Sequence, residues 1–550
     1  MIDMTVSLPG LLCYGISVAC SAHGEYRRLK RLEFAAEGAR IQQLRTFAFH
    51  FSCTRPDLLS HADIERILAS DRERASTRIV ERLLDLYDEY ARDGVVIGTH
   101  SPPVAYGTKG WPYVAARHAA RRHAPERTIG ADRIPVILPD RVRNRHVYGI
   151  GKTSMGKTTL LRNLFLQDAA RGMGIGVIGP ESELFTEELL PLVPQGRLDD
   201  VIYVNPADTD RPVPLNPLHL DDGEDFDRKV DETLTVFHRL IAEDGSAAPR
   251  MEMILRFTLC TLISIPGTTL LDIPHLLDRT DDTYRRWAVG RIENEEVRHF
   301  WTSVYPLYPK DAHLSLLNRL GRFLQPKVVR NILCQPGAGL SVRAAMDSGK
   351  IVLFNLSDGI LGELNAQLLG QLVVAKIQQA VMSRANIPKA ERRPFSLYID
   401  EFQSFCGGAG TSYEKMLSRA RKYGLWLHLF HQQCGQIPEP VMREILGNVG
   451  TIVVFQVGAT DARRLTRELE GAAPRFDHAR LTSLPIGVAY CLVDGALVLT
   501  ETCPPPHGGT DAIRDEAIRR SLEQFGVRPH AAGDQALGGL FPNVHLGDVF

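Results

Sequence analysis

The segment Gly151-Lys152-Thr153-Ser154-Met155-Gly156-Lys157-Thr158 constrains the fold more than any other part of the chain. It matches the pattern G-x-x-x-x-G-K-[ST], in which backbone N–H groups of a glycine-rich turn converge on a row of phosphates. Residues 146–150 before it predict a short buried strand, and residues 158–170 after it carry apolar side chains at helical spacing. The segment therefore predicts a nucleotide-binding loop whose following helix directs its N-terminus at the phosphates.

Individual roles follow from the chemistry of the loop. We expect Lys157 to reach the outer phosphates of ATP and the Thr158 hydroxyl to bind Mg²⁺. The alternative is a surface glycine loop before a helix, with no ligand. The candidate nucleotide-binding residues are Gly151, Thr153, Ser154, Met155, Gly156, Lys157, Thr158 and Thr159.

Composition narrows the class of protein. The chain has 550 residues, of which 44% are hydrophobic and 23% charged, and these values exclude disordered and fibrous proteins. A net charge of −1 gives no overall positive field, so contact with nucleic acid would need local patches or a ring-shaped assembly. The nine cysteines are scattered singly, without zinc-site spacing, which favours a reducing cytoplasm and no structural metal.

Two segments near the N-terminus carry open alternatives. The run 6–22 is the most apolar, but it contains Pro9 and Gly10 and is short for a bilayer, so we expect a buried strand or helix and no membrane span. Residues 117–145 are rich in arginine. They form either a solvated surface or a rim that contacts phosphates or a neighbouring subunit.

Short apolar runs, separated by helical segments, predict a mostly parallel, doubly wound α/β sheet. The runs are 175–178, 201–204, 351–356, 395–399, 425–430 and 451–456. The helical pattern of residues 221–345 predicts an all-α domain inserted into this core. We therefore divide the chain into a mixed region at 1–125 with a helix at 62–92, a core at 126–220 and 346–510, the insertion at 221–345, and a tail at 511–550.

A second group of candidate residues follows other predicted strands. Asp400 and Glu401 follow the run 395–399. Asp400 would hold Mg²⁺, and Glu401 would polarise the attacking water. The alternative for both acids is helix capping or a surface role. Gln432 follows the strand 425–431 and is a candidate sensor of the γ-phosphate. Among Arg419, Arg421 and Lys422, before that strand, any could stabilise transition-state charge or simply cap a helix C-terminus.

At this point the chain resembles a known family, the type IV secretion coupling proteins and TraG/TraD-like P-loop ATPases of the HerA/FtsK group. The resemblance runs from about residue 130 to residue 506. The segments that carry it are 146–161, 200–208 with Leu215-Asn216-Pro217, 352–357, Asp400-Glu401-Phe402-Gln403, Ala420-Arg421-Lys422-Tyr423 and 447–451.

The resemblance implies a RecA-like ATPase core, an all-α insertion and a homo-hexameric ring that moves DNA, with ATP sites between subunits. It also implies roles for individual residues. Lys157 and Thr158 match the Walker A pair, Asp400 and Glu401 the Walker B pair, Gln432 the sensor glutamine, and Arg421 the arginine finger. Secretion-system, relaxosome-like or nuclease proteins would be the partners, and the chain would be cytoplasmic or peripheral to the inner membrane through them.

The chain departs from the family pattern at three places. Gly179-Pro180-Glu181-Ser182-Glu183 replaces an Asp-Pro-His-Gly-Asp-like segment, so the strand-end carboxylate is missing or moved to Glu181. Gln456 stands where many relatives have arginine. The membrane-spanning N-terminus of conjugative coupling proteins has no counterpart in this sequence, which weakens a direct assignment to an inner-membrane channel.

Three functions therefore stand as hypotheses. The first is an ATP-driven DNA translocase, supported by the hydrolytic residues and the helical insertion. The second is a secretion or assembly ATPase that acts on protein cargo. The third is a nucleotide-dependent interaction module, for instance in a defence complex with a nuclease.

Overall fold

The computed structural model describes residues 94–100, 134–221, 224–241, 249–336, 339–406, 410–472, 476–493, 495–506 and 509–528. The chain divides into two compact units, Met1–Gly172 with Trp426–Gly508 and Met173–Leu425 with Gly509–Phe550. The apolar run 6–22, the helix expected at 62–92 and most of the arginine-rich segment 117–145 lie outside the described residues.

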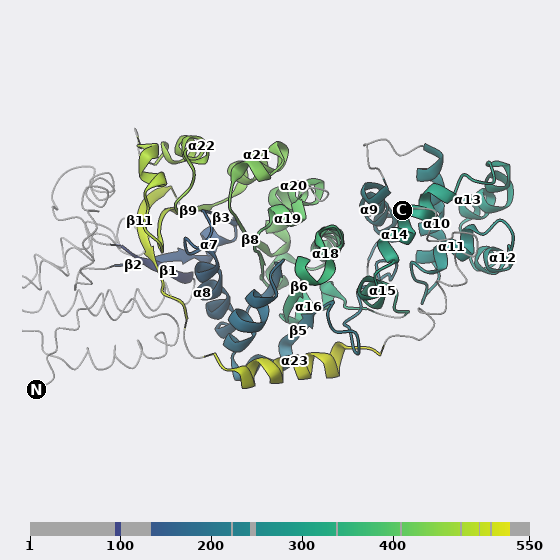
Figure 1. The fold of residues 1–550 in the computed structure, drawn as a ribbon, viewed down its shortest axis with the longest axis horizontal. Helices are drawn as coiled ribbons and strands as arrows, with labels where there is room; N and C mark the ends of the chain where they lie inside the picture. The colour runs from purple at the N-terminus through teal and green to yellow at the C-terminus, as the bar shows by residue number, and fades with distance from the viewer. Residues whose placement is uncertain are drawn as a thin grey trace, which may run out of the picture. The chain divides into compact units, whose positions relative to one another are not determined.

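The first unit combines parallel strands with an antiparallel extension (Figure 1). Strand β3 (Val147–Ile150) lies between β8 (Leu425–His431) and β9 (Thr451–Val454) and runs parallel to both. These three strands are buried along their whole length, which explains their continuous apolar sequences. Beyond β9, the antiparallel strands are in order β10 (Val488–Val493), β11 (Ala496–Thr502), β1 (Gly94–His100) and β2 (Ile134–Pro139).

Helix α8 (Lys157–Ala170) joins the two parts of this unit. The Gln167 side chain accepts from the Val96 N–H at 2.8 Å and donates to the Val96 carbonyl at 2.9 Å, so α8 satisfies the backbone of β1. The buried Arg143 of α7 (Asp140–Arg143) donates to Asp168 of α8 at 2.7 Å and to His428 of β8 at 2.9 Å. The other helices are η9 (Cys434–Gln436), α21 (Glu439–Asn448), α22 (Ala459–Leu469) and η10 (His478–Thr482).

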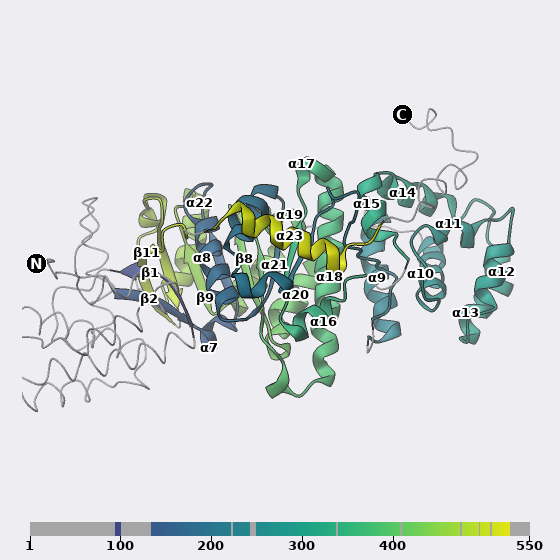
Figure 2. The ribbon, with the colours of Figure 1, turned by 90° about the horizontal axis from the view of Figure 1, so that it is seen from below.

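The second unit contains four parallel strands in the order β7-β4-β6-β5. They are β4 (Gly174–Gly179), β5 (Val201–Val204), β6 (Ile351–Asn355) and β7 (Phe395–Ile399). Every residue of these strands is buried, as continuous apolar runs require. Helix α23 (Asp511–Phe525), yellow in Figure 2, packs on β5, where the Tyr203 N–H donates to the Ser521 hydroxyl at 2.7 Å.

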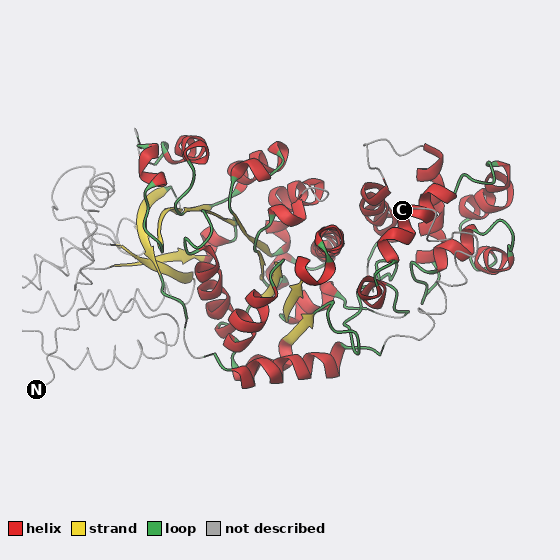
Figure 3. Ribbon diagram, in the orientation of Figure 1, coloured by secondary structure: helices red, strands yellow, loops and turns green. Residues whose placement is uncertain are grey.

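Further helices connect these strands (Figure 3). The α-helices are α16 (Val342–Ser348), α17 (Asp358–Leu361), α18 (Glu363–Ser383), α19 (Gln403–Cys406) and α20 (Gly410–Arg419). The segment between β4 and β5 contains the π-helix η1 (Leu184–Leu189) and the 3-10 helices η2 (Leu190–Leu192) and η3 (Gln195–Asp200). Three more 3-10 helices are η6 (Arg384–Asn386), η7 (Lys389–Glu391) and η8 (Ala420–Tyr423).

Between β5 and α16, the described residues form helices and no strand. Phe257 stacks on Phe300 with ring centroids 4.1 Å apart, and the Trp301 indole N–H donates to the Thr261 hydroxyl at 2.7 Å, so aromatic side chains contribute to a core that also contains many leucines and isoleucines. The helices are α9 (Phe226–Ile241), α10 (Pro249–Ile263), α11 (Asp272–Leu277), α12 (Thr283–Val289), α13 (Glu295–His299), η4 (Phe300–Val304), η5 (Tyr305–Leu307), α14 (Leu314–Leu324) and α15 (Lys327–Leu333).

These observations confirm the predicted α/β class, a mostly parallel sheet surrounded by helices. The antiparallel strands β1, β2, β10 and β11 were not expected from the sequence.

The four domain boundaries stay a prediction. Within the described ranges, no helix has the length and apolar character needed to cross a membrane.

Candidate functional site

The phosphate loop connects β3 to α8 in the first unit. Ser154 and Gly156 have φ angles of 62° and 117°, and these left-handed conformations make the turn compact. A Cβ at Gly151 would lie 2.5 Å from the Cβ of Phe455, so no larger residue fits there. Gly156 is the N-cap of α8 and brings no side chain to cap its first N–H groups. The loop is therefore shaped to bind an anion at a helix N-terminus.

Lys157 lies across this loop. Its side chain is buried, and Nζ donates to the Gly151 carbonyl at 2.8 Å and to the Lys152 carbonyl at 3.1 Å. Thr158 and Thr159 follow it in the first turn of α8, whereas Thr153 and Ser154 are exposed in the loop. The predicted nucleotide-binding residues thus lie in the loop and in the first turn of α8.

Gln432 lies next to the phosphate loop in the same unit. Strand β8 pairs with β3 so that His431 is opposite Ile150, and the Gly151 N–H donates to the His431 carbonyl at 3.3 Å. Gly151 and Gln432 are therefore the first residues after the carboxyl ends of two neighbouring parallel strands, β3 and β8. On the other side of β3, the Lys152 N–H donates to the Gln456 carbonyl at 2.8 Å, so Gln456 contributes a backbone contact to the loop.

A histidine and a tyrosine beside the loop were missed by sequence reasoning. The hydroxyl of Tyr148 lies 2.6 Å from Nε2 of His431. Burial lowers the pKa of His431 to about 3 and raises the pKa of Tyr148, so the phenol donates to a neutral imidazole. The signal that could have revealed the pair is the presence of two polar residues inside runs that are otherwise apolar.

The carboxylates Asp400 and Glu401 lie in the second unit, directly after β7. Asp400 is buried, and its N–H donates to the Ile178 carbonyl of β4 at 3.0 Å. Glu401 has a φ angle of 45°, which is unusual for a residue with a side chain, and its N–H donates to Oδ1 of Asp400 at 3.1 Å. Gln403 donates to Oε2 of Glu401 at 2.6 Å. Two acids are thus held in defined positions at the carboxyl end of a parallel strand.

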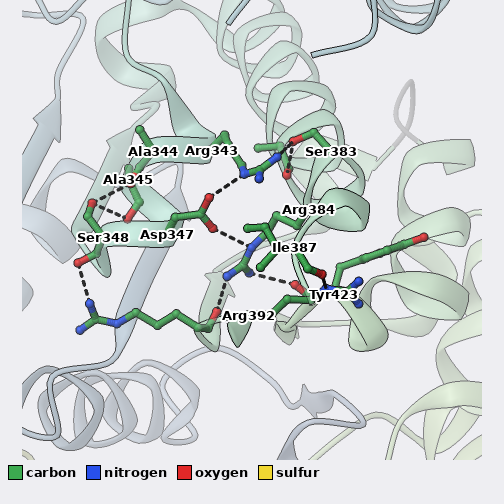
Figure 4. A network of polar contacts seen from close by, with 12 residues as sticks. Arg343, Ala344, Ala345, Asp347, Ser348, Ser383, Arg384, Ile387, Arg392 and Tyr423 are labelled. Carbon is green, nitrogen blue, oxygen red and sulfur yellow. Dashed lines mark hydrogen bonds and ion pairs between the residues drawn. The ribbon is translucent and has the colours of Figure 1, made fainter. Parts of the chain in front are cut away.

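The turn that carries Arg421 is η8, also in the second unit. Its backbone is held by arginine side chains: Arg384 donates to the Tyr423 carbonyl at 2.9 Å, and Arg392 donates to the Lys422 carbonyl at 2.5 Å (Figure 4). Arg384 is fully buried and forms an ion pair with Asp347, 2.9 Å apart. Arg421 itself is exposed on this fixed turn.

The strand end that lacks the expected carboxylate also lies in this unit. Glu181, after β4, is exposed, while Ser182 accepts from the buried Asn355 amide at 3.1 Å. Asn355 also donates to the Tyr203 hydroxyl at 2.9 Å. An amide and two hydroxyls therefore occupy the carboxyl ends of β4, β5 and β6.

Comparison with known proteins gives matches among solved structures. No protein-family model and no curated protein matches the chain. The plasmid coupling protein TrwB, in complex with the non-hydrolysable ATP analogue ADPNP, aligns with a TM-score of 0.50 and 18% identity over 75% of this chain and 95% of that chain. The chain has the fold of a coupling protein.

Two further solved structures are similar. The unbound conjugative coupling protein TrwBdeltaN70 has a TM-score of 0.49 and 19% identity, covering 68% of this chain and 88% of that chain. VirB4 of Thermoanaerobacter pseudethanolicus has a TM-score of 0.47 and 16% identity, covering 66% and 90%. The coupling-protein fold shown by the ADPNP complex confirms the RecA-like core and, at the level of the fold, the resemblance stated from the sequence motifs.

Proposed function

We propose that the chain is an ATP-hydrolysing motor of the coupling-protein kind that moves DNA. The observation that carries this proposal is the placement of Lys157, which is buried and bonded to two carbonyls of a loop that ends at a helix N-terminus. A buried lysine ammonium held across a loop at a helix N-terminus is well placed to meet the charge of a triphosphate. The coupling-protein fold supports the same nucleotide chemistry.

Each candidate residue has a distinct task in this proposal. Lys157 and the N–H groups of the loop bind the phosphates, Glu401 polarises the attacking water, and Gln432 senses the γ-phosphate. The Thr158 hydroxyl and the Asp400 carboxylate are oxygen donors of the kind that a small divalent cation prefers, so they fit Mg²⁺. When bound, Mg²⁺ would neutralise developing charge on the phosphate oxygens.

Two variants test hydrolysis. Lys157→Ala removes the phosphate contact, and Glu401→Gln removes the base but keeps the shape of the side chain. We expect each to lower kcat for ATP about 100-fold or more. Turnover is measured in a coupled assay, with thermal denaturation to show that both variants fold. Turnover that is unchanged in Lys157→Ala would exclude the proposed site.

DNA as cargo is tested by stimulation. One solved protein with this fold is a plasmid coupling protein, and for that reason we favour DNA over protein as the moved substrate. ATP turnover is measured with no nucleic acid, with single-stranded DNA and with double-stranded DNA, in wild type and in Glu401→Gln. We expect one form of DNA to raise wild-type turnover. Turnover that responds to a polypeptide and to neither DNA would instead favour a protein-secretion ATPase.

A further inference from the structure

The turn after β7 places an amide next to the proposed base. Nε2 of Gln403 lies 2.6 Å from Oε2 of Glu401, and both side chains are half-buried. The backbone at Glu401 is in the left-handed region, with φ of 45°. This conformation bends the chain sharply, so that a residue only two positions later can reach the Glu401 carboxylate.

Two aromatic anchors fix the turn on either side of Gln403. Phe402 is fully buried and packs edge-on against Tyr413, with ring centroids 5.7 Å apart. Phe405 is also fully buried and lies so close to Gly370 of α18 that a Cβ there would be 2.2 Å from its ring. The backbone of Gln403 is therefore set by the core and does not depend on the bond to Glu401.

The orientation of the Gln403 amide follows from charge. A carboxylate accepts hydrogen bonds only, so the amide must present Nε2 to it, and a flipped amide would place two oxygens in contact. The other atom of the amide, Oε1, is buried and has no hydrogen-bond partner among the described residues. A buried acceptor without a partner lowers the stability of a fold, so Oε1 gives no reason for a glutamine at this position. The favourable interaction of the Gln403 amide is the hydrogen bond from Nε2 to Glu401.

We propose that Gln403 is a positioning residue that holds the Glu401 carboxylate in one rotamer, so that it can polarise the water that attacks ATP. The inference rests on the proposed function, in which Glu401 acts on the water. A free glutamate side chain samples several rotamers, and only some of them direct the carboxylate at the nucleophile. The charge-assisted bond to Gln403 removes this freedom before the nucleotide binds.

The test uses the full chain and variants of matched size. Gln403→Met keeps the length of the side chain but has no donor, and Gln403→Glu places a second carboxylate against the first. We expect both to lower kcat about tenfold, with Gln403→Glu at least as slow as Gln403→Met. The KM for MgATP and the Kd for ADP stay within about twofold of wild type, because binding does not use the Glu401 rotamer.

Glu401→Gln separates the two possible failures. If Glu401→Gln keeps wild-type turnover, the role proposed for Glu401 is wrong. If Glu401→Gln is inactive and Gln403→Met has the kcat of wild type or a higher one, only the role of Gln403 is overturned. Parallel losses of kcat, ADP affinity and thermal stability in Gln403→Met would make Gln403 a structural residue and would also overturn the proposal.

Discussion

Tyr148 and His431 show how a neutral polar pair is held beside a charged loop. Both side chains are fully buried and come from the neighbouring strands β3 and β8, and the Lys157 ammonium adds to burial in lowering the pKa of His431. The imidazole therefore stays neutral while it accepts from the Tyr148 hydroxyl. The carbonyl of the same histidine accepts from Gly151, so this pair links the sheet to the first residue of the phosphate loop.

This pair makes stability depend on pH. The pKa of His431 is about 3 in the folded chain and 6.5 in an unperturbed histidine, so the unfolded chain takes up the proton first as the pH falls. Lowering the pH from 7 to 5 should reduce the free energy of unfolding by about 2 kcal/mol through this group. Stability is thus lost on the acid side of pH 6.5, the usual result for a lowered histidine pKa.

The measurement is urea denaturation at pH 7 and pH 5 in wild type, His431→Gln and His299→Gln. His299 is exposed, so its replacement should leave the difference between the two pH values as in wild type. His431→Gln should be less stable than wild type at pH 7, but its free energy of unfolding should differ less between pH 7 and pH 5. An equal difference in all three proteins would show that His431 does not titrate as described.

At the scale of elements, the 3-10 turn η8 depends on a buried arginine. Arg384 bonds to the carbonyls of Tyr423 and Arg393 and pairs with Asp347, so one guanidinium ties together three segments of the second unit (Figure 4). The planar donor group matches this geometry, which a lysine could not reproduce. The exposed Arg421 is thereby presented on a turn with little freedom to move.

Arg384→Met should destabilise the second unit by about 3 kcal/mol, because it removes a fully buried guanidinium and leaves two partly buried carbonyls and a carboxylate with fewer partners. Arg464→Met is the control: Arg464 pairs with Glu439 at 2.9 Å, but Arg464 is partly exposed and Glu439 exposed, whereas Arg384 is fully buried. Its loss should cost less than about 1 kcal/mol. Thermal denaturation of the two variants measures the contrast, and equal melting temperatures would contradict it.

The sequence predicted the parallel strands because each is a continuous apolar run, the pattern that burial on both faces requires. It predicted the phosphate loop because that geometry is local, set by Gly151, Gly156 and the helix that follows. The antiparallel strands were missed, although the sequence Asp-Gly at 494–495, between two apolar runs, is a typical hairpin signal. Strand β1 pairs with β11, about 400 residues away in sequence, and no local pattern predicts such a pairing.

The supporting contacts of the site were less accessible to sequence reasoning. Arginine is usually exposed, so nothing in the sequence indicated that Arg384 is buried while other arginines of the chain are exposed. The bond from Gln403 to Glu401 depends on the left-handed φ of Glu401, a conformation that the residue type does not suggest. The predicted roles of Arg421, Gln432, Asp400 and Glu401 stay predictions, and the Arg421→Ala and Glu401→Gln variants test two of them.

For the whole molecule, the ring that the family resemblance implies can be tested by mixing inactive subunits. If Arg421 serves the ATP site of a neighbouring subunit, Lys157→Ala and Arg421→Ala should each be inactive alone, whereas an equal mixture should regain about a quarter of wild-type turnover, from interfaces that pair the two intact residues. Native mass measurement establishes the ring size. A mixture as inactive as its components would place Arg421 and Lys157 in the same subunit's site.

Helix α23 has a consequence for how copies of the chain can associate. Strand β5 is the last strand in its sheet, and a bare last strand offers a row of N–H and C=O groups to which a strand of another molecule can add. The Ser521 hydroxyl already bonds to the Tyr203 N–H at this border, and the helix covers it. Helix α23 therefore opposes sheet-to-sheet fusion and fibril growth at β5.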